Sequence, residues 1–186
     1  MKITFNENFT TSLEEVASFS AKNNSPVPVL SHIYMAVEDF SVTLRATSGE
    51  VYAEMFIPLQ EEWLVEEPGQ VLLDPRTVIP FLKKVGKGKQ VTMVATENQL
   101  SMTAGKSKIQ LPLHNVDDFP NPPAIVQNYT IPVDKAMKKA LRGCSYAVGE
   151  SLARPVLRGI HVIKRNGGLI VEATDSHRLA WYFIEK

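Results

Sequence analysis

The sequence predicts an α+β fold built from βαβββ units, with helices on one face of antiparallel sheets. Three segments of the chain share one order of elements: a short strand, a helix and then several strands. The chain also repeats itself at a spacing of 127 residues without a gap. Pro28–Leu30 returns as Pro155–Leu157, and Ala46 returns in the same register as Ala173. A repeat this long fits a globular domain rather than a solenoid unit.

The proline-rich stretch Asp117–Pro123 is the expected domain boundary, because clustered prolines and aspartates are typical of a linker. We expect residues 1–124 to form a complete domain of two halves, about 1–64 and 65–124. Residues 125–186 then form the first half of a second domain.

The first segment opens with an alternating strand at Lys2–Asn6. Ser12, followed three residues later by Glu15, has the pattern of a capping box and predicts a helix that runs to about Lys22. The stretch Asn23–Pro26 then breaks the helix. The strands expected after it are Ile33–Glu38, Val42–Ala46 and Val51–Pro58.

The second segment repeats this order with a strand at Gln70–Leu73. Asp74 and Pro75 are a good helix start, with an N-cap followed by proline in the first turn, and Gly86 suits the helix end. The strands expected after it are Gln90–Ala95, Gln99–Thr103 and Lys108–Leu113.

The third segment begins with a strand expected at Tyr129–Val133. Asp134 caps a helix that reaches about Tyr146. The turn signal Arg165–Gly168 predicts a hairpin. The strands expected here are Gly159–Lys164, Leu169–Thr174 and Leu179–Glu185. We expect Trp181, Tyr182 and Phe183 on the last strand to pack in the core of this half-domain, with some of that surface exposed because the domain is incomplete.

Composition indicates an ordinary soluble globular protein, 44% hydrophobic and 22% charged, with a formal net charge of zero. The sequence has no run of about 18 apolar residues, so we expect no membrane span. A single cysteine, Cys144, cannot form an internal disulfide, and no signal peptide precedes the first strand. These features predict a cytoplasmic location.

The segment Asp175, Ser176 and His177 suggests an enzyme at first sight. On a strand, however, the hydroxyl and the imidazole point to opposite faces, which opposes a hydrolytic triad. Asp175 and His177 together with His161 could hold a metal, but no motif spacing supports such a site. We therefore expect no catalytic residue and no metal, and the plainest interpretation is a hydrogen-bonded turn that ends a strand.

The octet Ala173–Ala180, ATDSHRLA, together with this element order resembles the bacterial sliding clamp family, the DNA polymerase III beta subunit. Weaker matches at Pro28–Leu30, Asp117–Pro120 and Arg154–Leu157 fall in the same order as in that family. The resemblance covers essentially all of the chain. It implies the DNA-clamp, or processivity, fold and a protein that has no catalytic activity and needs no cofactor.

In that family each subunit has three such domains, and two subunits close a ring around duplex DNA with helices lining the hole. The ring tethers DNA polymerase and repair proteins, which insert a short clamp-binding peptide into a pocket. The resemblance therefore implies duplex DNA, bound without sequence preference, and clamp-binding proteins as partners. The matching pocket positions on this chain are Leu157, Thr174, Ser176, His177, Arg178 and Leu179.

One helix face carries four cations at i, i+3, i+4 and i+7: Lys135, Lys138, Lys139 and Arg142. Taken alone, this pattern is most often a solvated helix face. The family resemblance favours a second interpretation, in which the four side chains lie over DNA phosphates, because clamp helices line the DNA hole.

The chain lacks the rest of the second domain and all of the third. We expect a homo-oligomer in which a second chain completes the incomplete domain by two-fold symmetry. Four chains would supply the twelve half-domains of the family ring. Two alternatives stay open: a stand-alone clamp-like peptide-binding module that acts as a decoy or adaptor, and a truncated fragment of a longer clamp.

Overall fold

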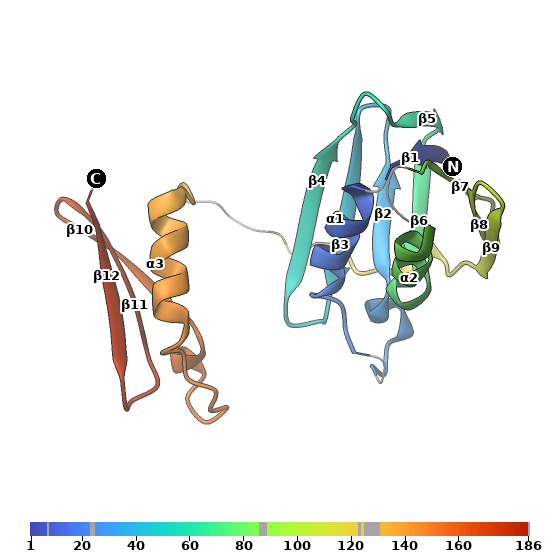
Figure 1. The fold of residues 1–186 in the computed structure, drawn as a ribbon. Coiled ribbons are helices and arrows are strands. Elements are labelled where there is room, and N and C mark those ends of the chain that lie inside the picture. The colour runs from blue at the N-terminus through green and yellow to red at the C-terminus, as the bar shows by residue number, and fades with distance from the viewer. Residues whose placement is uncertain (7, 23–24, 86–88, 123, 125–130, 186) are drawn as a thin grey trace. The chain divides into compact units, whose positions relative to one another are not determined.

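The computed structural model describes residues 1–186 except 7, 23–24, 86–88, 123, 125–130 and 186. The chain divides into two compact units, Met1–Pro123 and Ala124–Lys186, and each has its own hydrophobic core (Figure 1). Within the described residues, no helix has the length and apolar character needed to cross a membrane.

The described part of the first segment of the larger unit contains one α-helix, one 3-10 helix and five strands. Its elements are β1 (Lys2–Phe5), α1 (Asn8–Ala17), the 3-10 helix η1 (Pro28–Ser31), β2 (Ile33–Val37), β3 (Ser41–Thr47), β4 (Tyr52–Pro58) and β5 (Leu64–Glu67). Strand β5 was not expected from the sequence, and it pairs with β1. The pairing explains how a short segment with three exposed residues can form a strand.

The second segment begins with a strand and the helix that Asp74 and Pro75 predicted. Its elements are β6 (Gly69–Leu73), α2 (Pro75–Val85), β7 (Val91–Ala95), β8 (Gln99–Ala104), β9 (Ser107–Pro112) and the 3-10 helix η2 (Val116–Asp118). Asp74 Oδ1 accepts a hydrogen bond from the backbone N–H of Arg76 at 3.0 Å, so the predicted N-cap is confirmed. Gly86, the expected helix end, lies outside the described residues.

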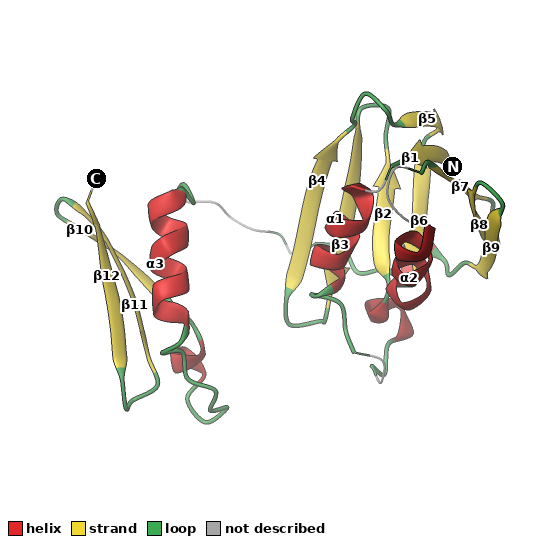
Figure 2. Cartoon of the chain, in the orientation of Figure 1, coloured by secondary structure: helices red, strands yellow, loops and turns green. Residues whose placement is uncertain are grey.

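The two segments exchange one strand each. Strand β1 of the first segment lies between β5 and β7 in the five-stranded sheet β5-β1-β7-β8-β9. Strand β6 of the second segment completes the four-stranded sheet β4-β3-β2-β6. Figure 2 shows α1 and α2 beside each other against these strands. The exchange explains why both segments contribute to a single hydrophobic core.

Helix α1 begins at Asn8, so the predicted capping box at Ser12 is wrong. Phe9, Leu13 and Val16 are all buried, and their i, i+4, i+7 spacing places them on the core side of the helix. The ring of Phe9 lies 5.5 Å from that of Trp63 between centroids, edge to face. Burial of Phe9 thus extends the helix toward its N-terminus. The helix also ends at Ala17, short of the predicted Lys22, where the chain changes to i→i−3 hydrogen bonds.

The smaller unit packs one helix against one sheet. Its elements are α3 (Lys135–Ser145), the 3-10 helix η3 (Pro155–Arg158), β10 (His161–Arg165), β11 (Gly168–Thr174) and β12 (Leu179–Glu185). The sheet order is β10-β11-β12, and the predicted hairpin is present because Arg165 pairs with Gly168.

The predicted strand Tyr129–Val133 is not formed over residues 131–133, and residues 129–130 lie outside the described chain. The equivalent strand in the larger unit, β1, pairs with β5 and β7 rather than with its own βββ group. Residues 124–186 contain no counterpart of β5 or β7 among their described strands. A strand here would therefore have no neighbour to pair with.

Strand β12 points its small and aliphatic residues inward. Ala180 and Ile184 are buried, whereas Trp181 is 64% and Phe183 43% exposed. The prediction that Trp181 and Phe183 pack in the core is therefore wrong, and of the three aromatic residues Tyr182 alone packs against it. Side chains alternate along a strand, so the register that buries Ala180 turns Trp181 outward.

Candidate functional site

Helix α3 is fixed at its start and along one side. Asp134 is the N-cap, and its Oδ1 accepts a hydrogen bond from the backbone N–H of Met137 at 2.9 Å. Met137, Ala140 and Cys144 are buried against the sheet, and the Cys144 thiol donates to the Val171 carbonyl at 3.3 Å. The opposite side of the helix must therefore face away from the core.

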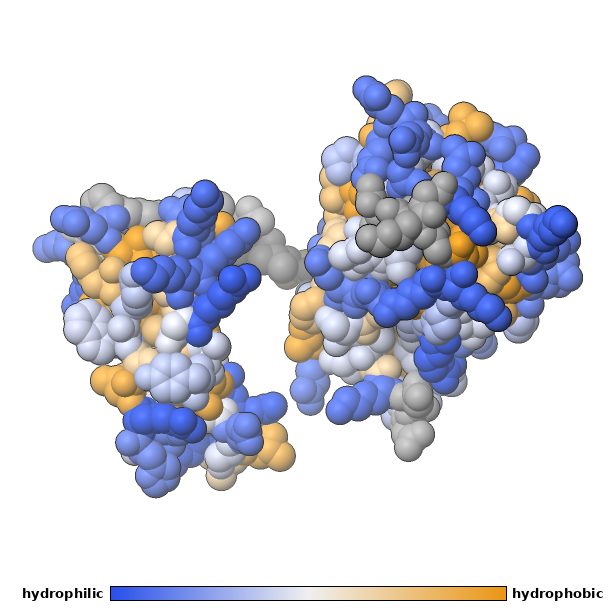
Figure 3. All heavy atoms as spheres, in the orientation of Figure 1, coloured by the Kyte–Doolittle hydropathy of each residue, from blue (hydrophilic) through white to orange (hydrophobic). Residues whose placement is uncertain are grey.

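That opposite side carries the four predicted cations. Lys135, Lys138, Lys139 and Arg142 are all exposed. Lys139 Nζ lies 5.7 Å from the centroid of the Tyr182 ring, within the range of a cation–π interaction. No ion pair joins any of the four to a carboxylate in the described part of the chain. Figure 3 shows hydrophilic side chains over α3.

The neutral net charge hides two oppositely charged units. Residues 124–186 contain ten Lys and Arg against five Asp and Glu, and residues 1–123 contain ten against fifteen. The formal charge is therefore +5 for the smaller unit and −5 for the larger one. A polyanion is attracted to the smaller unit and repelled by the larger one.

An open groove of about 350 Å³ lies on the smaller unit between η3 and the ends of β10, β11 and β12. Three of the six predicted pocket residues line it: Leu157, Thr174 and Leu179. The other three, Ser176, His177 and Arg178, belong to the turn beside it and do not line it. The lining residues that sequence reasoning missed are Val156, Gly159, Ile160, His161, Glu172 and Ala173.

His161 and Glu172 form one wall of this groove. They are directly opposite in the β10–β11 register, and His161 Nδ1 lies 3.1 Å from Glu172 Oε1. Alternation along β11 could have identified Glu172, which lies two positions before the predicted Thr174, and the strand register then places His161 directly opposite it. The pair gives a mainly apolar groove one polar wall.

Residues 175–178 form a turn and not a strand, so the strand geometry used to weigh a triad was wrong. The Asp175 carboxylate closes the turn: its Oδ1 accepts from the backbone N–H groups of His177 and Arg178, each at 2.9 Å. Arg178 Nε donates to Asp175 Oδ2 at 2.7 Å. The hydrogen bond from Arg178, followed by those from the backbone, lowers the pKa of Asp175 far below its ordinary value. Asp175 therefore has a structural role here.

Two further contacts brace the turn. Ser176 has a left-handed backbone conformation, φ 78°, and its Oγ accepts from Arg154 Nη1 at 3.0 Å. The Arg178 guanidinium lies 5.9 Å from the centroid of the Tyr146 ring. Both arginines are thereby directed toward the turn and the end of α3.

Known proteins show the same architecture. A family model for the N-terminal domain of the DNA polymerase III beta subunit matches residues 1–123. This chain belongs to that family. It is 33% identical over 160 residues to a beta sliding clamp of Staphylococcus epidermidis and 28% identical over 167 residues to that of Bacillus subtilis.

The beta clamp relatives are about twice as long as this chain. The two alignments cover 83% and 87% of the chain but only 42% and 44% of the relatives. The structure of the beta subunit from the DNA polymerase of Streptococcus pyogenes matches with a TM-score of 0.88 at 25% identity, covering 100% of this chain and 50% of that one. The sliding clamp of Bacillus subtilis gives 0.86 at 26%, with the same coverage. The predicted clamp fold is confirmed.

The metal site considered for Asp175, His177 and His161 is not formed. Among the described residues of this clamp-family chain, no group of three or more His, Cys, Asp or Glu side chains is arranged to hold a metal ion. His161 is paired with Glu172, and the Asp175 carboxylate is engaged within its own turn.

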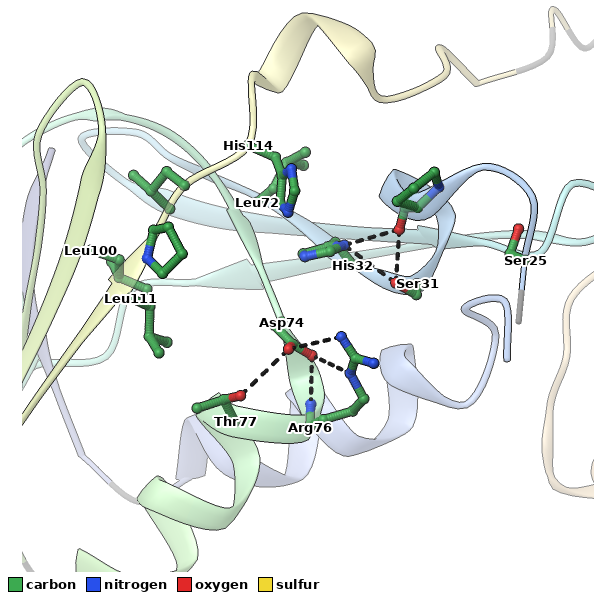
Figure 4. Close-up of a pocket in the computed structure, with 13 residues that line it drawn as sticks. Ser25, Ser31, His32, Leu72, Asp74, Arg76, Thr77, Leu100, Leu111 and His114 are labelled. Atoms are coloured by element: carbon green, nitrogen blue, oxygen red, sulfur yellow. Dashed lines mark hydrogen bonds and ion pairs between the residues drawn. The ribbon is translucent and has the colours of Figure 1, made fainter. Parts of the chain in front are cut away.

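A second pocket, of about 400 Å³, lies on the larger unit near the starts of β2 and α2 (Figure 4). His32 and His114 lie edge to face there, with ring centroids 4.6 Å apart. Burial lowers the pKa of His32, although a hydrogen bond between its Nδ1 and the Pro28 carbonyl opposes the change. Burial alone would raise the pKa of Asp74, but hydrogen bonds from Arg76 lower it. The charged groups here are paired with each other, and we assign them no ligand.

Proposed function

We propose that this chain acts as a non-enzymatic sliding-clamp-like protein. It encircles or contacts duplex DNA without sequence preference and tethers DNA polymerase and other replication and repair proteins, conferring processivity. The observation that carries this proposal is the exposed four-cation face of α3 on a unit of charge +5 with the clamp fold. A cytoplasmic location and the absence of a cofactor belong to the same proposal.

The α3 face is suited to phosphates rather than to bases. Lysine and arginine contacts to the DNA backbone add affinity and carry no sequence information. Burial of the other side of α3 in the unit's core holds the four cations in one row. The cap at Asp134 fixes where that row begins.

The groove of the smaller unit is the proposed site for a partner peptide. Leu157 and Leu179 supply an apolar slot, and Thr174 at the end of β11 pairs with Leu179. Ser176, His177 and Arg178 form the rim, where backbone and side-chain donors can meet peptide carbonyls. Arg178 keeps its Nη groups for this role, because its Nε serves Asp175.

We further propose that residues 125–186 are the first half of a second clamp domain and that copies of the chain associate through it. Strand β10 pairs only with β11 among the described strands, although the equivalent β2 is paired on both sides. An unpaired edge invites a further strand, and two-fold symmetry would let two copies satisfy each other. Light scattering over a concentration series tests this: a mass that stays at one chain would contradict it.

The DNA proposal is tested by equilibrium binding to a fluorescent duplex over a range of salt concentrations. We expect affinity to fall steeply with salt, by about 0.9 log units per log unit of salt for each phosphate contacted, and to be the same for unrelated sequences. Affinity that does not change with salt would contradict a phosphate-based contact.

The second candidate is a stand-alone peptide-binding module that never encircles DNA. It is favoured by the observation that every residue lining the groove comes from the smaller unit. Peptide binding without measurable DNA binding would support this candidate. A third candidate, a piece of a longer clamp, agrees with the chain's coverage of under half of its relatives.

A further inference from the structure

The turn between β3 and β4 in the larger unit repeats the turn beside the groove of the smaller unit. Thr47 Oγ1 donates to the Val51 carbonyl at 2.7 Å, and Thr174 Oγ1 donates to the Arg178 carbonyl at the same distance. The backbone N–H of Gly49 donates to Thr47 Oγ1 at 3.0 Å, as that of Ser176 does to Thr174 Oγ1 at 3.1 Å. Gly49 also has the same left-handed conformation, with φ 92°.

The strands behind these turns have the same register. Tyr34 pairs with Arg45 as His161 pairs with Glu172, and Thr47 pairs with Tyr52 as Thr174 pairs with Leu179. The 3-10 helix η1 precedes β2 as η3 precedes β10. The larger unit therefore contains the counterpart of the groove, built from the positions that lie 127 residues earlier.

In the larger unit this counterpart is filled by Phe119. Phe119 is 7% exposed and packs with Val29 and Leu72, and its ring lies 5.6 Å from that of Tyr34 between centroids. Val29 is consequently 8% exposed, whereas its counterpart Val156 is 85% exposed. The stretch expected to be a linker thus contributes one side chain to the packed structure of the larger unit.

The segment around Phe119 is bound in the manner of a short peptide. Asn115, Asp117, Asp118 and Pro120 are exposed, and Phe119 is the buried anchor. The rest of the segment is held by the turn of η2, in which the Asn115 side chain accepts from the backbone N–H of Asp117 at 3.2 Å.

The occupied groove leaves one polar group unsatisfied. Tyr52, which packs against the same cluster, has a buried Oη without a hydrogen-bond partner in the described part of the chain. A buried hydroxyl without a partner is costly. A different occupant with a carbonyl group near Tyr52 would remove that cost.

We propose that the larger unit carries a second peptide-binding groove, which the chain's own Asn115–Pro120 segment occupies through Phe119. Its external ligand is a short peptide with an aromatic anchor side chain, which enters when Phe119 leaves. The apparent affinity for such a peptide is reduced by the fraction of molecules in which Phe119 is docked. This site is separate from the groove of the smaller unit and does not depend on the proposed clamp function.

The test uses the full chain with Val156→Asp, which puts a negative charge into the apolar lining of the groove of the smaller unit at an exposed position and so disfavours peptide binding there. The probe is a fluorescein-labelled peptide with the sequence of residues 115–122, NVDDFPNP, and binding is followed by fluorescence anisotropy. We expect the chain that carries both Val156→Asp and Phe119→Ala to bind the probe at least about tenfold more tightly than the chain that carries Val156→Asp alone. A probe with alanine in place of its phenylalanine should lose this gain.

Two further variants keep the result interpretable. Phe40→Ala removes the same ring from a position that is 85% exposed, and it should give no gain. Asn115→Ala loosens η2 while leaving Phe119 in place, and we expect a gain of about two- to fivefold. Equal probe affinity in the folded Phe119→Ala and parent chains overturns the proposal. If Phe119→Ala does not fold, an absent gain in Asn115→Ala overturns it.

Discussion

The two units are built from the same repeat but differ in how the repeat is completed. In the larger unit β2 lies between β3 and β6, and four of its five residues are buried. In the smaller unit the equivalent β10 is an edge strand, and none of its five residues is buried. A helix followed by three strands thus forms its sheet alone, but the strand exchange between two segments is what buries the first long strand.

The first helices of the two units, α1 and α3, differ in the charge of their exposed residues. Helix α3 carries cations at Lys135, Lys138, Lys139 and Arg142, and the positions 127 residues earlier on α1 are Asn8, Thr11, Ser12 and Glu15. Helix α1 instead provides Phe9 to the core, where α3 has the exposed Ala136. The repeat therefore preserves strand register and turn geometry. Both helices pack on their cores through one face, and α3 adds a row of four exposed cations that α1 does not have.

Removing the α3 cations should have the largest effect. With all four changed to Gln, we expect the plot of log binding constant against log salt concentration to become shallower. Its slope should fall in magnitude by about three to four, because each phosphate contact contributes about 0.9. Fluorescence anisotropy with a labelled duplex measures it. The matched control changes four exposed lysines of the larger unit to Gln: Lys84, Lys89, Lys106 and Lys108. An equal loss in the control would show that total charge, and not the α3 face, governs binding.

Truncating Phe9 should have the second largest effect. Phe9→Ala removes a fully buried ring from the cluster with Phe5 and Trp63, and we expect the free energy of unfolding of the larger unit to fall by about 3–5 kcal/mol. Urea unfolding followed by Trp63 fluorescence measures it in a Trp181→Phe background. Phe40→Ala, at an exposed position, should stay within about 0.5 kcal/mol.

Exchanging the residues at the two equivalent turns should have a smaller effect on stability, and the effect should have opposite signs in the two units. Gly49→Ser places a side chain at φ 92° and should destabilise the larger unit by about 1–2 kcal/mol. Ser176→Gly relieves the same strain at φ 78°, less the loss of its hydrogen bond with Arg154, and should stabilise the smaller unit by under about 1 kcal/mol. Urea unfolding of each unit decides it, and two changes of the same sign would contradict the equivalence.

Acid should weaken the larger unit slightly through His32. Because burial lowers its folded-state pKa, the unfolded chain binds a proton more readily. The contribution of His32 to stability is therefore complete above its ordinary pKa of about 6.5 and is lost as the pH falls through the lower folded value. His114 and Arg76 oppose protonation, and Asp74 favours it.

Urea midpoints measured between pH 7.5 and 5 test this effect. His32→Asn should flatten the decline in the larger unit, and Phe40→Ala, which removes no titratable group from an exposed position, should leave the decline unchanged. A steeper decline in His32→Asn would mean that the sign is wrong.

Local chemistry predicted several elements correctly. Asp74 and Pro75 start α2, Asp134 caps α3, and the turn signal at Arg165–Gly168 closes the β10–β11 hairpin. Each of these depends on neighbouring residues only. The candidate site was predicted in part: Leu157, Thr174 and Leu179 line the groove, but Ser176, His177 and Arg178 lie on the turn beside it.

Three of the failures involve partners distant in sequence. Strand β5 exists because β1 is available beside it, and α1 starts at Asn8 because Phe9 meets Trp63. Phe119 was expected in a linker and instead packs with Val29 and Leu72. No pattern within a few residues of these positions predicts such contacts, because the partner that buries each residue lies some 45 to 90 residues away.

By itself, the sequence determined the repeat, its register, the N-caps of α2 and α3 and the cation spacing of α3, since these depend on residue order and on contacts within a few positions. Only the tertiary structure decided which strands are exchanged, that Phe119 fills one groove while its counterpart stays open, and that Trp181 faces outward. The physical reason is that burial is decided by what packs opposite a residue. For the first long strand, the partner is β6 in one unit, and no described strand takes that place in the other.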